Sequence, residues 1–585
     1  MINDEIADKL LERLVNRIEQ ANTYILEQIG KSIRKIGSVS PSKAQQLIQI
    51  MRYGGDYDKI IRKLAKITEL NVKDIKKIFQ EVARTNLDFS KQFYKYRKLQ
   101  FIPWDENQAL RKQVDALTNS AIQDYINLTS TKALGFSVQR LDNNGKLKTV
   151  FKSLSEAYVD TLDQAVLSVG QGKTTFDQEM RRIMKELGES GIKTINYADD
   201  RSIRLDSAIR MNLKAGLSNL SYETQRITGS QFDADGWEIT VHEFPAEDHA
   251  LAQGRQFSIE QYEQLQTTGY ATDYTGLEID LHKYNKNGEQ QKTFRPIRAY
   301  NCYHWENAIV LGVSKPRYSN DELQKIMDRN ETGFDFEGEH YSMYQGTQLQ
   351  RKIELEVRKQ KDMQIMARAG DNEQLAMESQ TKINQLTQKY KELNQASGLK
   401  PKLERLSASG YHKINVKINK NDFIDFKTND FQDERLKDIG KKYFDFPTNN
   451  SLQEYVNQRE GIARRMKESD EYKEKMLNIA EDIEQLKKPS EINFVAYVGH
   501  EEGLDLRNKG FAISSSISEG IARGYKLRKG KNAEVSKIYI QKGADIISTY
   551  NTKNKQFNVQ GEIIIPMNNV YKLVKLNKNE YLYTK

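Results

Sequence analysis

The stretch DEIADKLLERLVNRIEQ (residues 4–20) sets the pattern for the first part of the chain. Ile6, Leu10, Leu14 and Ile18 recur at every fourth position. An apolar stripe with this spacing is typical of an amphipathic α-helix that packs one side against a core. The sequence therefore predicts that the protein begins with a long helix.

Helical patterns continue for most of the next two hundred residues. One exception is a predicted β-hairpin, in which residues 136–141 and 147–151 flank the turn residues Asn143-Asn144-Gly145. Near Gly236 the pattern changes to short strands and polar loops. A continuous helical stretch is expected over 345–396.

The C-terminal part is predicted to be rich in strands, at 494–498, 536–540 and 562–566. We therefore expect a multidomain α+β protein with four parts. These parts are a mainly helical N-terminal region (1–235), a small mixed α/β central module (236–344), a long helical linker (345–404) and a C-terminal mixed α+β domain (405–585).

Composition narrows the class of protein. The 585 residues include 90 Lys and Arg against 81 Asp and Glu, which leaves a net charge of +9 and a mild preference for acidic partners. Apolar runs are far shorter than the ~20 residues of a membrane span, and the acidic N-terminus does not resemble a signal peptide. We therefore expect no association with membranes. The single cysteine, Cys302, excludes an intrachain disulfide.

Four residues of the central module carry nitrogen or sulfur donors: His242, His249, Cys302 and His304. Together they could form a Cys-His₃ zinc site. The spacings match no standard zinc finger, so we favour histidines bonded to backbone carbonyls and a small buried cysteine. A third interpretation is a nucleophilic Cys–His pair.

The motifs around these residues resemble a known family. His249 is followed by Gln253-Gly254, Asn301-Cys302-Tyr303-His304 forms a box, and Gly312-Val313-Ser314 precedes Pro316. Gln350, Arg351, Glu354, Arg358 and Lys361 then lie along one predicted helix. This order resembles the phage minor capsid protein 2 family, relatives of the Mu-type head morphogenesis proteins, although Tyr303 stands where that family usually has Arg.

The resemblance implies a structural protein of the virion, assembled in the host cytoplasm and associated with the portal of the phage head. Its partners would be the portal and other head proteins. Packaged DNA is a further expected partner, with which the net positive charge is compatible.

The C-terminal domain resembles a second family, the mono-ADP-ribosyltransferases of the Arg–Ser–Glu group. The motifs are the strand 494–499 ending in glycine, the 509–516 segment with three serines, and the strand that carries Gln560-Gly561-Glu562 and ends at Pro566. The resemblance implies NAD as the substrate and a host protein as the acceptor. A carboxylate near the ribose would stabilise the positive charge that develops as nicotinamide leaves.

The resemblance assigns roles to nine residues. Glu562, Gln560 and Ser514 would be catalytic: Glu562 would stabilise the ribose, Gln560 would meet the acceptor and Ser514 would orient the glutamate. The NAD-binding residues would be Tyr497, Gly499, His500, Phe511, Ser515 and Ser516.

One departure from this second family is serious, because Val498 occupies the position of the arginine that binds the NAD phosphates. His500, Arg507 and Arg523 are other candidates for that role. We expect that a substitute facing Glu562 across a cleft would favour an enzyme, whereas a packed Val498 would favour a catalytically degenerate, structural domain. A prophage-encoded ADP-ribosylating toxin is a further alternative.

Overall fold

A computed structural model of the chain divides into two compact units. Unit 1 comprises Met1–Phe334, His340–Ala376 and Leu399–His412, and unit 2 comprises Asp335–Glu339, Met377–Gly398 and Lys413–Lys585. The structure describes residues 4–37, 56–141, 146–154, 156–157, 176–196, 201–284, 289–299, 302, 304–416, 418, 420–428, 433–458, 469–508, 512–529, 533–552, 561–566 and 572–584. Within these residues, no helix is both long enough and apolar enough to span a membrane.

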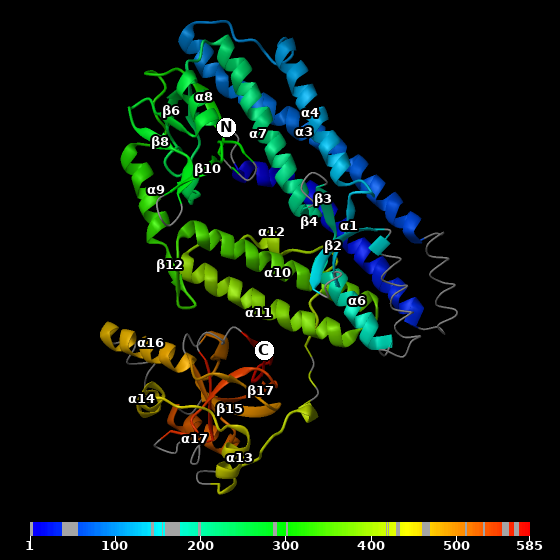
Figure 1. Ribbon diagram of the computed structural model, residues 1–585, viewed down its shortest axis with the longest axis vertical. Helices are drawn as coiled ribbons and strands as arrows, with labels where there is room; N and C mark the ends of the chain where they lie inside the picture. Colours follow the sequence, from blue (N-terminus) through cyan, green and yellow to red (C-terminus); the bar gives the residue numbers. More distant parts are fainter. Residues whose placement is uncertain are drawn as a thin grey trace. The chain divides into compact units, whose positions relative to one another are not determined.

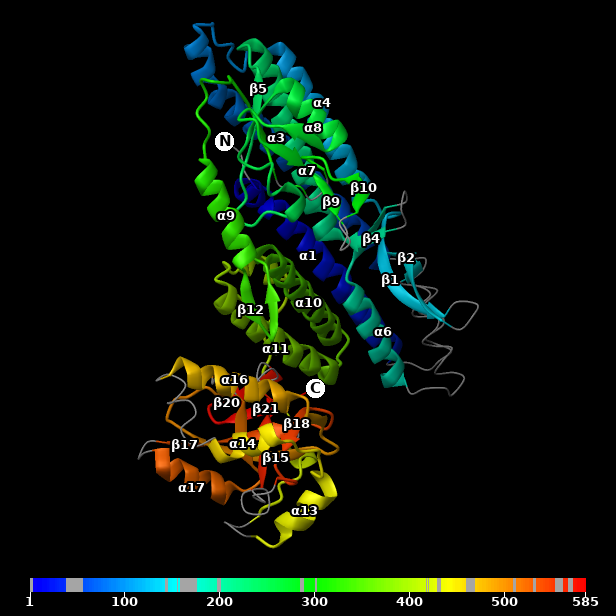
Figure 2. The same ribbon diagram turned by 60° about the vertical axis from the view of Figure 1, so that its left-hand side comes forward.

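Long helices form the framework of unit 1 (Figures 1 and 2). They are α1 (Asp4–Gly37), α3 (Asp56–Arg97), α4 (Gln108–Leu128), α6 (Phe176–Ser190), α7 (Leu205–Gln231) and α10 (Met343–Ala369). Helix α1 packs against α3, α7 and α10, and α7 also packs against α3 and α4. Because α1 has neighbours on several sides, its buried stripe runs through Ala7, Leu11 and Leu14, while Ile6 lies at the exposed edge.

A four-stranded antiparallel sheet joins this helical framework. Its order is β2-β1-β3-β4, and its strands are β1 (Leu134–Leu141), β2 (Leu147–Ser153), β3 (Lys193–Asn196) and β4 (Arg201–Arg204). The two strands of the predicted hairpin are confirmed, while its turn residues 143–145 lie outside the described residues. Residues 201–204, which lie within the stretch expected to be mostly helical, pair with β3 as a strand before α7 begins.

The central module, apart from Asp335–Glu339, lies within unit 1 and consists of small sheets and short helices. Its three-stranded sheet has the order β11-β5-β6, formed by β5 (Gly236–Ile239), β6 (Gln256–Ser258) and β11 (Glu306–Ile309). Two antiparallel pairs, β7 (Tyr270–Thr272) with β8 (Glu278–Asp280) and β9 (His282–Tyr284) with β10 (Gln290–Phe294), and the helices α8 (Ile259–Thr268) and α9 (Asn320–Thr332) complete it. Its core includes Trp237, Phe257 and Tyr262.

The helical stretch expected over 345–396 is two helices. Helix α10 ends at Ala369, and α11 (Glu373–Ser397) begins after a break of three residues. Asp371 adopts a left-handed backbone with φ of 62°, and the Asn372 side chain accepts a hydrogen bond from the Leu375 N–H at 2.9 Å. An asparagine that caps a helix N-terminus in this way starts a new helix.

Unit 2 is built on an eight-stranded sheet of order β14-β18-β19-β16-β15-β17-β21-β20. The strands are β14 (Lys488–Pro489), β15 (Phe494–His500), β16 (Ile513–Ser516), β17 (Glu534–Ile540), β18 (Asp545–Ser548), β19 (Glu562–Ile565), β20 (Leu573–Asn577) and β21 (Glu580–Tyr583). Three of these, β15, β17 and β19, confirm the strands predicted from the sequence. The pairing of β17 with β21 is parallel.

Both faces of the unit 2 sheet are buried. Phe494, Ala496 and Val498 belong to one apolar cluster, whereas Val495 and Tyr497 belong to another, as alternation along β15 requires. The helices of this unit are α13 (Arg435–Tyr443), α14 (Asn450–Gln458), α16 (Asp470–Glu484) and α17 (Glu519–Lys529). They surround the strands in Figure 1.

A tight glycine turn in unit 1 generates a prediction. Gly333 has φ of +55°, and a Cβ atom there would lie 2.0 Å from the backbone oxygen of Tyr341. Gly276 also has a positive φ but has open space around it. We expect Gly333→Ala to lower the free energy of unfolding of unit 1 by about 2–4 kcal/mol, because strain and overpacking add. Gly276→Ala should lower it by less than half as much. Equal losses in chemical unfolding experiments would contradict this account of the turn.

Candidate functional site

Cys302 lies between two histidines of the central module. His249 ends a short 3₁₀ turn, Glu247–His249, while Cys302 and His304 precede β11. The Cys302 Sγ atom lies 3.4 Å from His249 Nδ1 and 3.5 Å from His304 Nδ1. Donor atoms of the three residues lie within 4.8 Å of one another, a spacing that could hold a metal ion. The structure thus brings together three of the four predicted ligands.

The fourth predicted ligand, His242, lies beside this group. Its ring packs edge-on against the His304 ring, with centroids 4.6 Å apart. Its backbone N–H donates to Gln253 Oε1 at 2.8 Å, and the same oxygen lies 3.4 Å from His304 Nε2. Gln253 was noted only as part of a motif, and the structure places it against two of the four histidine and cysteine residues.

Burial keeps the thiol and one imidazole of this group neutral. Burial raises the pKa of the Cys302 thiol to about 11. Burial also lowers the pKa of His304 well below its usual value, and the neighbouring His242, His249 and Arg295 lower it further. Because a thiol, unlike a thiolate, is a weak nucleophile, these shifts argue against a nucleophilic Cys–His pair.

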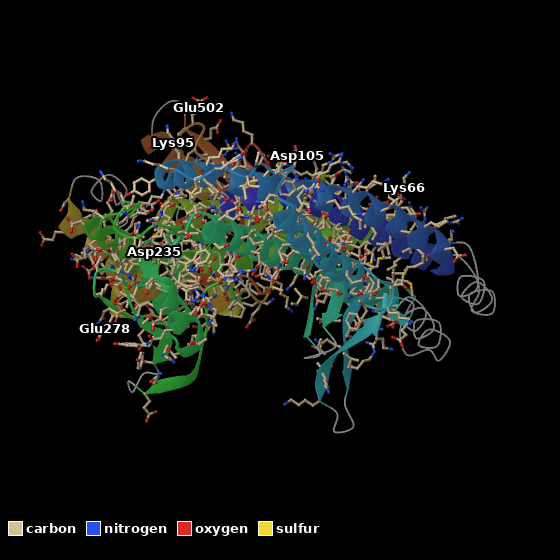
Figure 3. The ribbon with its side chains drawn as sticks, turned by 90° about the horizontal axis from the view of Figure 1, so that it is seen from above. Lys66, Lys95, Asp105, Asp235, Glu278 and Glu502 are labelled. Atoms are coloured by element: carbon tan, nitrogen blue, oxygen red, sulfur yellow. The ribbon has the colours of Figure 1, made fainter. Side chains whose placement is uncertain are left out.

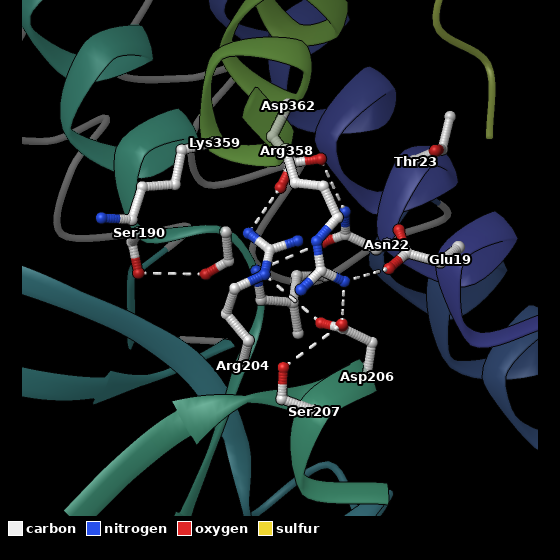
Figure 4. A network of polar contacts seen from close by, with 12 residues as sticks. Glu19, Asn22, Thr23, Ser190, Arg204, Asp206, Ser207, Arg358, Lys359 and Asp362 are labelled. Carbon is white, nitrogen blue, oxygen red and sulfur yellow. Dashed lines mark hydrogen bonds and ion pairs between the residues drawn. The ribbon is translucent and has the colours of Figure 1, made fainter. Parts of the chain in front are cut away.

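A second polar site is a network of buried charges among α1, α7 and α10 (Figure 4). Arg204 NH1 lies 2.8 Å from Asp362 Oδ2, and Arg204 Nε lies 3.3 Å from Asp206 Oδ1. Arg358 pairs with Asp206 and with Glu19, whose Oε1 atom is 3.2 Å from Arg358 NH1. Arg204 and Asp206 are each 6% exposed and Asp362 is fully buried, so these charges depend on one another for solvation.

Asn22 extends the network to the backbone. Its Nδ2 donates to Asp362 Oδ1 at 2.9 Å, and its Oδ1 accepts from the Ile192 N–H at 3.2 Å. One residue of α1 therefore orients a carboxylate of α10 and fixes the chain just before β3. The network joins four segments that are far apart in the sequence.

The network contains three carboxylates and two guanidinium groups, so one carboxylate is in excess. Burial and the charge of Asp206 raise the pKa of Glu19 to about 8. Burial would also raise the pKa of Asp206, but the charges of Arg358 and Arg204 outweigh burial and lower the pKa of this residue. Near neutral pH a protonated Glu19 therefore leaves two carboxylates opposite two guanidinium groups.

No motif in the sequence marks this network as a site. A signal was present, because Glu19 follows Leu11 and Val15 at intervals of four and so continues the apolar stripe of α1. Arg358 had been noted only as part of the motif on one predicted helix. Two other residues of that motif, Gln350 and Lys361, donate to the backbone oxygens of Lys400 (3.0 Å) and Leu406 (2.6 Å), and so hold the 399–412 segment.

The third candidate site lies in unit 2, where Ser514 and Glu562 meet. Strands β16 and β19 pair antiparallel, with Ser516 opposite Glu562 and Ser514 opposite Ile564. The Ser514 hydroxyl donates to Glu562 Oε1 at 2.5 Å, and Glu562 is 2% exposed. The serine and glutamate that the second resemblance assigned to catalysis are therefore in contact. Gln560, the third, lies outside the described residues.

The predicted NAD-binding residues have varied surroundings. The Tyr497 hydroxyl donates to Asp425 Oδ2 at 2.7 Å, and burial together with Asp425 raises its pKa. His500 Nε2 lies 2.7 Å from Ser536 Oγ, and Gly499 pairs with Val535 on β17.

Among the predicted serines, Ser515 donates to the Ile563 backbone oxygen at 2.7 Å, and Ser516 Oγ accepts from the Ser518 N–H at 3.0 Å. Phe511 lies outside the described residues.

At the position of the missing arginine, a valine side chain packs into the apolar core. Val498 is 3% exposed and belongs to the apolar cluster of β15. Of the substitutes considered, Arg507 pairs with Asp505 at 2.7 Å and Arg523 pairs with Glu519 at 2.6 Å. The packed valine is the arrangement expected of a structural domain, while the Ser514–Glu562 contact is the arrangement expected of the enzyme family.

The fold and these sites define a two-unit α+β protein with a charge-linked helical unit and a separate sheet-based unit. Residues 2–394 match the sequence model of the family described as phage minor capsid protein 2. The chain belongs to this family, which supports a role as a structural head protein of the virion that contacts other head proteins. Comparisons with curated proteins and with solved structures found no significant match.

The charge network predicts a pH dependence. The folded-state pKa of Glu19, about 8, lies above its ordinary value of 4.5, so folded protein retains a proton that unfolded protein has released. Because the unfolded state releases this proton first, the contribution of Glu19 to the free energy of unfolding falls as pH rises from about 4.5 to about 8. We expect Glu19→Gln to remove this fall and to gain roughly 1–4 kcal/mol over wild type between pH 5 and pH 8.5.

The matched control is Glu12→Gln, at an exposed position of the same helix. Its unfolding free energy, measured with urea at each pH, should run parallel to that of the wild type. A Glu19→Gln curve that also runs parallel would contradict the assignment of the excess proton to Glu19.

Proposed function

We propose that this protein is a minor component of the phage head that attaches beside the portal through unit 1. The observation that carries the proposal is the family match over residues 2–394, which covers nearly all of unit 1.

Helix α3 supports a contact with packaged DNA. It carries eleven Lys and Arg against six Asp and Glu. Lys66 and Lys95 are among its exposed side chains and project outward in Figure 3. Cationic side chains that neutralise phosphates release counterions, and this release provides affinity without sequence preference. We propose that α3 faces the DNA inside the particle, in addition to the protein partners of unit 1.

Purified particles test the attachment. Quantitative mass spectrometry of phage heads should find the chain in a few copies per head, and chemical cross-linking should join lysines of unit 1 to the portal protein. Heads that lack DNA should retain the chain, because the attachment is to protein. Recovery of the chain only from the host lysate, and never from particles, would contradict the proposal.

We propose a second activity for unit 2, the transfer of ADP-ribose from NAD to a side-chain amide of a host protein. In the enzymes that unit 2 resembles, Gln at the position of Gln560 goes with amide acceptors. The observation in its favour is the Ser514–Glu562 hydrogen bond at 2.5 Å between neighbouring strands. In the reaction, the bond between ribose C1′ and the nicotinamide nitrogen breaks, and nicotinamide leaves with the electron pair. A bond from C1′ to the acceptor nitrogen forms, and the acceptor loses one proton. Glu562 would stabilise the positive charge on the ribose.

Glu562→Gln tests this activity. With labelled NAD and host lysate, wild-type protein should label an acceptor protein and release nicotinamide. Glu562→Gln should reduce both rates by at least about 100-fold, the loss typical of a removed charge-stabilising group. The matched control is Glu481→Gln, which changes an exposed carboxylate on α16 of the same unit. Absence of labelling and of nicotinamide release by the wild type would leave unit 2 as a structural domain.

A further inference from the structure

The distances around Cys302 match those of a tetrahedral metal site. Zinc binds sulfur at about 2.3 Å and imidazole nitrogen at about 2.0–2.1 Å, so two such ligands on a tetrahedron lie about 3.6 Å apart. The Sγ atom of Cys302 lies 3.4 Å from His249 Nδ1 and 3.5 Å from His304 Nδ1. Both sulfur–nitrogen distances would therefore change by only a few tenths of an ångström if an ion were bound between these atoms.

The other nitrogen of each ring is held by an oxygen acceptor. His249 Nε2 lies 2.7 Å from the backbone oxygen of Arg295, and His304 Nε2 lies 3.4 Å from Gln253 Oε1. A carbonyl oxygen can only accept, so each Nε2 carries the proton and each Nδ1 presents its lone pair toward the sulfur. Ligand histidines in metal sites are typically oriented in this way by a carbonyl or carboxylate oxygen on the opposite nitrogen.

The support of His249 extends one step further from the cluster. The Arg295 side chain pairs with the buried Asp248 at 2.8 Å, so Arg295 is fixed at both its backbone oxygen and its guanidinium group. Asp248 directly precedes His249 in the chain. The ring of His249 is therefore held by Arg295, and Arg295 is anchored in turn by Asp248, the residue before His249.

With these tautomers, two Nδ1 lone pairs face one sulfur atom. A thiol has one proton and can donate it to only one of the two Nδ1 atoms beside it. A metal ion bound to the thiolate satisfies both lone pairs at once. The same carbonyl contacts that sequence analysis offered as an alternative to a metal site are therefore the outer contacts that such a site requires.

We propose that His249 Nδ1, Cys302 Sγ and His304 Nδ1 bind one Zn²⁺ ion in the central module. One thiolate with two imidazoles is a donor set that suits zinc in tetrahedral geometry. Water takes the fourth position, with His242 at its edge. Because the ligands join the 3₁₀ turn to the segment before β11, the ion would stabilise a module made of short strands and loops.

Metal analysis of the full chain tests the proposal. Protein purified without chelators should contain about one zinc ion per chain, and Co²⁺ in its place should give the thiolate charge-transfer and tetrahedral d–d absorption bands of a Cys-ligated site. Cys302→Ser should lose the charge-transfer band and most of the zinc. Gln253→Ala removes the oxygen beside His304 Nε2 and leaves the three ligands in place, so it should weaken zinc binding about 10–100-fold without changing the stoichiometry at saturation.

Two further variants test which group is the fourth zinc ligand and provide a control. His242→Ala should retain zinc if water is the fourth ligand, and loss of zinc in this variant would overturn that part of the proposal. His340→Ala, at an exposed position of unit 1, should behave as wild type. A wild-type chain that contains no zinc, takes up none on addition of Zn²⁺ and gives no thiolate band with Co²⁺ would overturn the site, whatever the variants do.

Discussion

The ion pair between Arg204 and Asp362 is the interaction on which unit 1 most depends. It joins β4 to α10, and Asp362 is fully buried at 2.8 Å from the guanidinium. A buried charge without its partner costs several kcal/mol, so the pair forms only when both elements are in place. The same need for a charged partner extends to the start of α7 and to α1 through Asp206, Arg358 and Glu19. Apolar packing alone would tolerate small shifts of these helices, whereas the network does not.

Helix α7 connects this network to the central module. Asp206 lies in its first turn, and near its other end the Gln225 side chain accepts a hydrogen bond from the Ala308 N–H of β11 at 3.3 Å. At 1.5 Å per residue, the helix carries this connection from Asp206 to Gln225 over about 29 Å. Strand β11 directly follows Cys302 and His304, so the proposed metal ligands are held at the far end of the same helix. Two polar sites in unit 1 thus share one rigid element.

The sequence predicted most elements whose pattern is local. The long first helix, the hairpin strands and the strands β15, β17 and β19 follow from periodicity, and the family follows from the box around Cys302. The charge network could not be predicted, because its members lie up to 343 positions apart and pairing depends on tertiary contacts (Glu19 to Asp362). The break after Ala369 was missed because it rests on one left-handed residue and one asparagine cap. Among the cysteine and histidine residues, the sequence suggested four ligands and also histidines bonded to carbonyls. It could not show that the oxygens of Arg295 and Gln253 are the ones beside His249 and His304, because only folding brings them there.

A double-mutant cycle on Arg204 and Asp362 tests most directly whether the buried charges define unit 1. Unfolding of the full chain would be followed by hydrogen exchange in peptides from α1 and α10. We expect Arg204→Met and Asp362→Leu each to destabilise unit 1 by about 3–5 kcal/mol, because each leaves a buried charge without its partner. The double variant should lose far less than the sum. Losses that add within experimental error would contradict the claim that this pair organises the unit.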